Sequence, residues 1–137
     1  MIKNFLFFQF PWQLLMLSIF IQSSIGSLKI PDFGFKLSDK ILHFIVFGTL
    51  GILMARGMRN AKNKIVNESY ISITLMICIV YGILDEVHQY FVPGRYFSWW
   101  DWVADILGVI TLVWIYKRFI ESSELKDEES GKNGSMI

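Results

Sequence analysis

The side chains able to do chemistry in this sequence gather in three short segments, each of which adjoins a long apolar run. The segments are 39–43 (DKILH), 85–95 (DEVHQYFVPGR) and 101–105 (DWVAD). Together they hold both histidines of the chain, five carboxylates and one arginine. A histidine beside a carboxylate can act as a general base or proton relay, and histidines grouped with carboxylates also bind divalent metals.

Helical spacing relates the side chains within each segment. The first and last residues of 39–43, an aspartate and a histidine, are four positions apart and share one face of a helix. The two aspartates of 101–105 have the same spacing. In the middle segment, Glu86 is displaced by about 100° around the helix from Asp85, so these neighbours face different directions.

Four apolar runs must position these segments. The chain has 137 residues, of which 53% are hydrophobic and 18% charged, whereas soluble domains carry about 25% charged residues. A run of about 20 apolar residues crosses a bilayer, and in lipid only helices or closed barrels satisfy the backbone. We therefore predict an all-α polytopic membrane bundle of about four transmembrane helices, at 6–25, 37–54, 70–91 and 100–119. For the first run, a cleaved signal peptide is the alternative.

Loop charge predicts the orientation of these spans. The linker 56–64 carries four basic residues, and basic loops stay in the cytoplasm. We predict a multi-pass protein of the cell membrane with cytoplasmic termini, and with the connector 26–36 and the turn 92–95 outside. Residues 121–137 are acidic and lack apolar periodicity, which predicts a disordered tail. The net charge of +1 indicates no nucleic-acid partner, so the bilayer is the expected partner; the sequence leaves the oligomeric state open.

Ionisable groups inside spans are costly and usually face the bundle interior, so the three segments are expected to converge on one polar site. The predicted ligand-binding residues are Asp39, Lys40, His43, Asp85, Glu86, Gln89, Arg95, Asp101 and Asp105. His43, Asp85 and Glu86 are the candidates for catalysis. Neither H-x-x-x-H nor H-E-x-x-H is present, so we predict no metal ligands and no cofactor.

Four roles are compatible with such a cluster. A metal-activated water or a His–Asp general base would make the chain a membrane-embedded hydrolase or transferase acting on a lipid-linked or cell-wall precursor. A cleft for an amphiphilic, headgroup-bearing ligand would use Arg95, because a guanidinium suits phosphate and carboxylate oxygens. A purely structural network of interhelical hydrogen bonds would need neither a ligand nor catalysis.

The same segments, in this order and spacing, resemble the VanZ-like family of small bacterial membrane proteins. The resemblance covers residues 37–115 and rests on D-E-x-x-Q, then P-G-R, then D-x-x-A-D-x-x-G. It implies a transmembrane domain over residues 1–120 and a cell-envelope role such as low-level resistance to the glycopeptide teicoplanin. The nine residues named above match the polar signature of the family. At the position of Asp105, however, the family often has asparagine, and the position of His88 varies.

Overall fold

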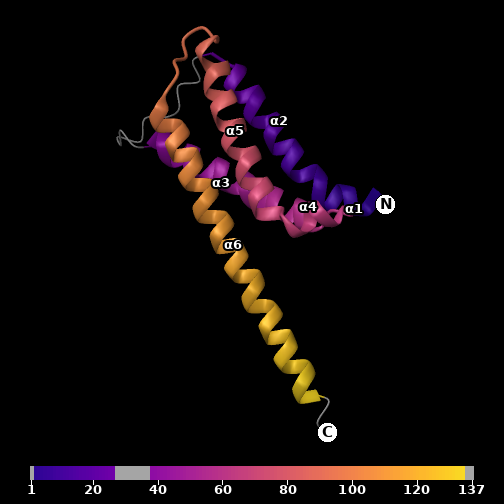
Figure 1. Cartoon of the computed structure of the whole chain (residues 1–137). Helices are drawn as coiled ribbons and strands as arrows, with labels where there is room; N and C mark the ends of the chain where they lie inside the picture. The colour runs from indigo at the N-terminus through magenta and orange to yellow at the C-terminus, as the bar shows by residue number, and fades with distance from the viewer. Residues whose placement is uncertain (1, 27–37, 135–137) are drawn as a thin grey trace.

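The described part of the chain comprises residues 2–26 and 38–134 of a computed structural model. Every secondary-structure element in this part is a helix (Figure 1). The elements are α1 (Ile2–Asn4), the π-helical turn η1 (Phe5–Gln9), α2 (Phe10–Ser24), α3 (Ser38–Arg59), α4 (Lys64–Glu68), α5 (Tyr70–Tyr90) and α6 (Trp99–Gly134). Most of the predicted connector 26–36 lies outside the described residues, as do residues 135–137 of the predicted tail.

Three helical stretches, 2–24, 39–59 and 70–90, are long and apolar enough to cross a membrane. With α6 as a long fourth helix, they confirm the predicted all-α polytopic bundle. The first stretch begins at Ile2 rather than at residue 6, because a π-helical turn joins α1 to α2. α3 ends at Arg59 rather than at residue 54, and basic side chains in its last turn interact favourably with the helix dipole.

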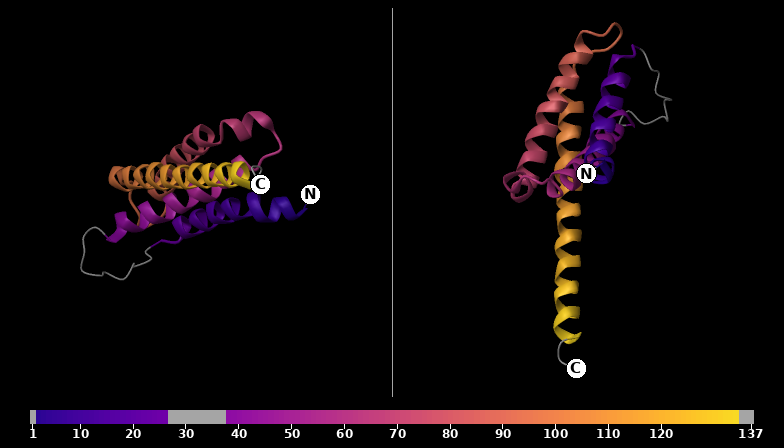
Figure 2. Two further views of the ribbon diagram at one scale, coloured as in Figure 1. Left: turned by 90° about the horizontal axis from the view of Figure 1, so that it is seen from below. Right: turned by 90° about the vertical axis from the view of Figure 1, so that its right-hand side faces the viewer.

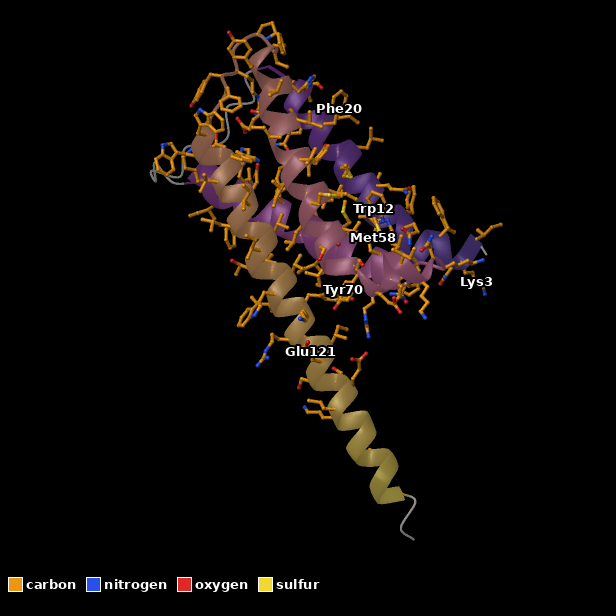
Figure 3. The ribbon with its side chains drawn as sticks, in the orientation of Figure 1. Lys3, Trp12, Phe20, Met58, Tyr70 and Glu121 are labelled. Carbon is orange, nitrogen blue, oxygen red and sulfur yellow. The ribbon has the colours of Figure 1, made fainter. Side chains whose placement is uncertain are left out.

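α6 extends well beyond the other helices at its C-terminal end (Figures 1 and 2). The sequence predicts disorder from residue 121, whereas the helix continues to Gly134. Local charge pairs account for the difference: Lys117 lies 3.7 Å from Glu121, one helical turn away, and Glu124 pairs with Arg59 of α3. Glu121 is labelled in Figure 3, on the part of α6 below the other helices.

α3 and α6 carry most of the polar segments, and their close approach to each other positions these segments. A Cβ atom on Gly108 would lie 2.1 Å from the carbonyl oxygen of Phe44, and one on Gly48 would lie 2.6 Å from Cδ1 of Leu112. Glycine at these positions therefore lets the helices pack closely, as small residues do in other membrane bundles. The buried apolar core consists of Ile19, Phe47, Leu50, Met54, Ala55, Cys78, Val109 and Val113.

One end of the bundle carries all three polar segments. α2 and α5 end there and α3 and α6 begin there, at the top of Figure 1, whereas Trp12, Met58 and Tyr70 in Figure 3 lie toward the opposite end. The turn from α5 to α6 contains Gly94 at a φ of 84°, a conformation that glycine adopts without strain. The amide of Arg95 closes this turn, and its side chain folds back toward the end of α5.

Candidate functional site

A partly open pocket of about 40 Å³ lies between α2, α3 and α5 at the polar end of the bundle. Its polar lining consists of Gln22, Ser23, Asp39, His43, Asp85, Gln89 and Arg95, and its apolar lining of Ile19, Leu42, Val46 and Phe47. A cavity of this volume accommodates about three water molecules, and therefore one small polar group of a ligand.

Asp85 is the centre of a hydrogen-bond network that ties α2 to α5. Its Oδ1 accepts a hydrogen bond from the hydroxyl of Ser23 at 2.6 Å, and its Oδ2 accepts one from Nε2 of Gln89 at 2.9 Å. Arg95 donates to Oε1 of Gln89 at 3.1 Å and to the backbone carbonyl of Gln22 at 3.3 Å. The network compensates the burial of the Asp85 carboxylate and holds the guanidinium beside the pocket.

His43, Glu86 and Asp105, from α3, α5 and α6, form a second group that we call the buried cluster. Nδ1 of His43 lies 3.0 Å from Oδ1 of Asp105, and Oε2 of Glu86 accepts a hydrogen bond from the backbone N–H of Ser98 at 2.8 Å. Glu86 is 0% exposed and Asp105 is 1% exposed. The second oxygens of these carboxylates, Oε1 and Oδ2, have no hydrogen-bond partner among the described residues.

Two sets of three side chains have the composition and geometry to hold a metal ion. The first is the buried cluster, and the second consists of Asp39, His43 and Asp101. In each set the potential ligand atoms lie within 4.8 Å of one another. In the second set, Asp101 already forms an ion pair with Lys40, which joins α6 to α3.

The structure places all nine predicted residues at one end of the bundle, in the pocket, the buried cluster and the Lys40–Asp101 ion pair. Asp39 and His43 both line the pocket, in keeping with their four-residue spacing, but the hydrogen bond of His43 is made to Asp105. His88 lies apart from both groups. The centroid of its ring lies 4.7 Å from that of Phe20 on α2, a residue labelled in Figure 3.

The sequence matches the VanZ/LLP1 family over residues 1–120, a range that includes every residue of the pocket and the buried cluster. The chain belongs to the VanZ/LLP1 family. No curated protein and no solved structure matches it significantly. The family resemblance inferred from the three polar segments is therefore confirmed.

The contribution of α2 to the site of this VanZ/LLP1 protein was not predicted. Ser23 is 4% exposed and bonds to Asp85, and Gln22 both lines the pocket and accepts a hydrogen bond from Arg95. Ser24 lies 2.9 Å from Nε2 of His88. Three consecutive polar residues at the end of an otherwise apolar run were the signal that would have indicated this side of the site.

His43 connects the two groups of this VanZ/LLP1 site, because it lines the pocket and also belongs to the buried cluster. A carboxylate partner fixes the tautomer and ring orientation of a histidine, which prepares it for proton transfer or metal binding. Five carboxylates surround it at this end of the bundle, against the cations of Lys40 and Arg95. The site therefore favours cations in general and offers an anion one local contact, at Arg95.

Proposed function

We propose that this VanZ/LLP1 protein binds the headgroup of an amphiphilic cell-envelope molecule in the pocket. The mixed lining carries the proposal, because the pocket is lined by both polar and apolar side chains. The pocket lies at the end of the membrane-crossing helices, the depth at which lipid headgroups meet the hydrocarbon. An amphiphile would place its headgroup against the polar side chains and the start of its chain against the apolar side chains.

The polar lining residues indicate the chemistry of the headgroup. A guanidinium has five N–H donors, and two hydrogen bonds of Arg95 are found among the described residues, so donors remain for a phosphate or carboxylate. Asp39 and Asp85 are acceptors in the lining of the same pocket. The best match is therefore an anion with neighbouring hydroxyl or ammonium groups, as in a lipid-linked or cell-wall precursor.

The proposed biological role is at the cell envelope. The basic linker 56–64 supports a cytoplasmic position for that end of the bundle and for both termini, which turns the pocket outward. Together with the family membership, an outward-facing headgroup site supports low-level resistance to glycopeptides such as teicoplanin.

Lipid binding tests the proposal directly. We expect undecaprenyl phosphate, added to the purified protein in detergent, to raise its melting temperature, and Arg95→Gln to abolish the increase. Arg118→Gln is the matched control, because Arg118 is exposed near the opposite end of the membrane portion of α6. Phosphatidylglycerol, added in the same way, distinguishes a lipid-linked carrier from bulk phospholipid. Equal shifts in wild type and Arg95→Gln with both lipids would refute headgroup binding in the pocket.

A second candidate function is catalysis on the same ligand. The His43–Asp105 pair supports it, because an imidazole oriented by a carboxylate beside a pocket is arranged as a general base. Glu86→Gln separates a functional site from a structural network when teicoplanin tolerance and thermal melting are both measured. Lost tolerance with unchanged melting supports a site that binds or converts a ligand. Lower melting without a separate loss of tolerance supports a structural network alone.

A further inference from the structure

We infer that His43, Glu86 and Asp105 bind one divalent transition-metal ion at the junction of α3, α5 and α6. This inference goes beyond headgroup binding and does not depend on it. The three side chains come from three different helices, yet their potential ligand atoms lie within 4.8 Å of one another. Ligands of a tetrahedral ion at about 2.1 Å are about 3.4 Å apart, so side-chain shifts of roughly 1 Å complete the site.

The unpaired carboxylate oxygens are the independent observation that indicates a ligand. Oε1 of Glu86 and Oδ2 of Asp105 are buried without a hydrogen-bond partner among the described residues. A buried carboxylate oxygen without a partner is costly, and native proteins leave few of them. Each carboxylate keeps its other oxygen bonded, to Ser98 and to His43 respectively. These bonds orient the free oxygens, and a cation between them would satisfy both.

The ligand set indicates which ions fit. One imidazole nitrogen with two carboxylate oxygens suits Zn²⁺, Mn²⁺ or Fe²⁺, whereas Ca²⁺ and Mg²⁺ prefer oxygen ligands alone. Zinc sites with three protein ligands keep a further position for water or substrate. Because His43 also lines the pocket, that position would lie next to the bound headgroup of the proposed ligand.

The alternative set of Asp39, His43 and Asp101 is a weaker site for two reasons. Asp101 is ion-paired with Lys40, and the ammonium group would repel a divalent cation. Neither Asp39 nor Asp101 is among the side chains that retain a buried oxygen without a partner. The buried cluster therefore has the stronger claim to the ion, and the two sets can be separated by mutation.

Metal binding to the purified full-length protein tests the inference. After treatment with EDTA and equilibration with Zn²⁺, we expect one ion per chain by mass spectrometry of the metal content. Glu86→Gln and Asp105→Asn should each weaken Zn²⁺ binding by about 100-fold or more, since loss of an outer partner alone costs 10- to 100-fold. Glu68→Gln, a matched control on the exposed helix α4, should bind as wild type does.

The remaining outcomes also decide the inference. Loss of the ion in Asp101→Asn but not in Glu86→Gln would move it to the alternative set and overturn our assignment. One ion retained in every variant, or less than stoichiometric Zn²⁺ in wild type, would overturn it as well. If the variants do not fold, Co²⁺ added to wild-type protein replaces them. A visible absorption band of tetrahedral Co²⁺ bound to nitrogen and oxygen supports the inference, and the spectrum of aqueous Co²⁺ refutes it.

Discussion

Nδ1 of His43 on α3 lies 3.0 Å from Oδ1 of Asp105 on α6, and the two side chains are 15% and 2% exposed. This is the point at which the polar site and the packing of the two most closely associated helices coincide. Because the two residues lie on different helices, the pair holds α3 and α6 together in addition to forming a chemical group.

Removing this pair should destabilise the bundle. We expect a double-mutant cycle of His43→Ala and Asp105→Ala to give a coupling free energy of about 0.6 kcal/mol and at most about 1.7 kcal/mol, the mean and the maximum measured for polar pairs between membrane helices. Unfolding in detergent with increasing dodecyl sulfate, in the presence of EDTA, gives the four free energies required. EDTA excludes a contribution from metal. Strictly additive single-mutant effects would show that the contact does not stabilise the fold.

The hydrogen bond from Ser23 to Asp85 makes a separate prediction, because it is the buried link from α2 to α5. Ser23→Ala removes the donor and leaves a carboxylate oxygen without it, so we expect a loss of about 1–3 kcal/mol in unfolding free energy. Ser18→Ala is the matched control. Its hydroxyl is exposed and bonds only to the carbonyl of Leu14 within the same helix, so its loss should change stability by less than about 0.5 kcal/mol. Equal effects of the two substitutions would contradict the structure.

The contact between α3 and α6 predicts an unusual ranking of two glycine substitutions. A Cβ on Gly108 would lie 2.1 Å from the backbone carbonyl oxygen of Phe44, which cannot move without the helix. A Cβ on Gly51 would meet the side chain of Val113 at 2.9 Å, and a side chain can adjust. Gly108→Ala should therefore cost about 1–3 kcal/mol and Gly51→Ala less, in the same unfolding assay. The reverse order would show that the helices are farther apart.

The outline of this fold could be predicted from the sequence because the controlling signals are local. The length of each apolar run depends only on its own residues, and so does the position of the polar segments at the run ends. The partners of the polar residues depend on how the helices are rotated against each other. Spacing relates His43 to Asp39 on one helix, whereas packing brings it to Asp105, 62 positions away.

Three further features were not predicted, the first two because their partners are far apart in the sequence. The polar end of α2 gave no indication of its partner, because Asp85 is 62 positions from Ser23 along the chain. The metal-ligand sets contain no motif in the sequence, since each combines residues from different helices. The extent of α6 was not predicted because residues 121–137 lack apolar periodicity, although charge pairs support an exposed helix.

The extension of α6 beyond residue 120 should contribute little to stability. Its ion pair with α3, between Arg59 and Glu124, involves side chains that are 31% and 61% exposed. Exposed pairs of this kind contribute about 0–1 kcal/mol. Deleting residues 121–137 and substituting Glu124→Ala should both leave the unfolding free energy within that range of wild type. A loss above about 2 kcal/mol on deletion, with no effect of Glu124→Ala, would show that the extension contributes to the fold in another way.

The orientation of the bundle decides whether the pocket can meet molecules outside the cell. Four basic residues in the linker 56–64 predict that this end is cytoplasmic, and hence that the turn before α6 is outside. A membrane-impermeant maleimide applied to intact cells should label Tyr96→Cys, which replaces a side chain 76% exposed, and should label Glu68→Cys only after permeabilisation. The native Cys78 is 1% exposed and gives little background. The opposite labelling pattern would place the pocket in the inner leaflet, where extracellular glycopeptides have no access. The proposed resistance role would then be wrong, whereas the proposed binding site would be unaffected.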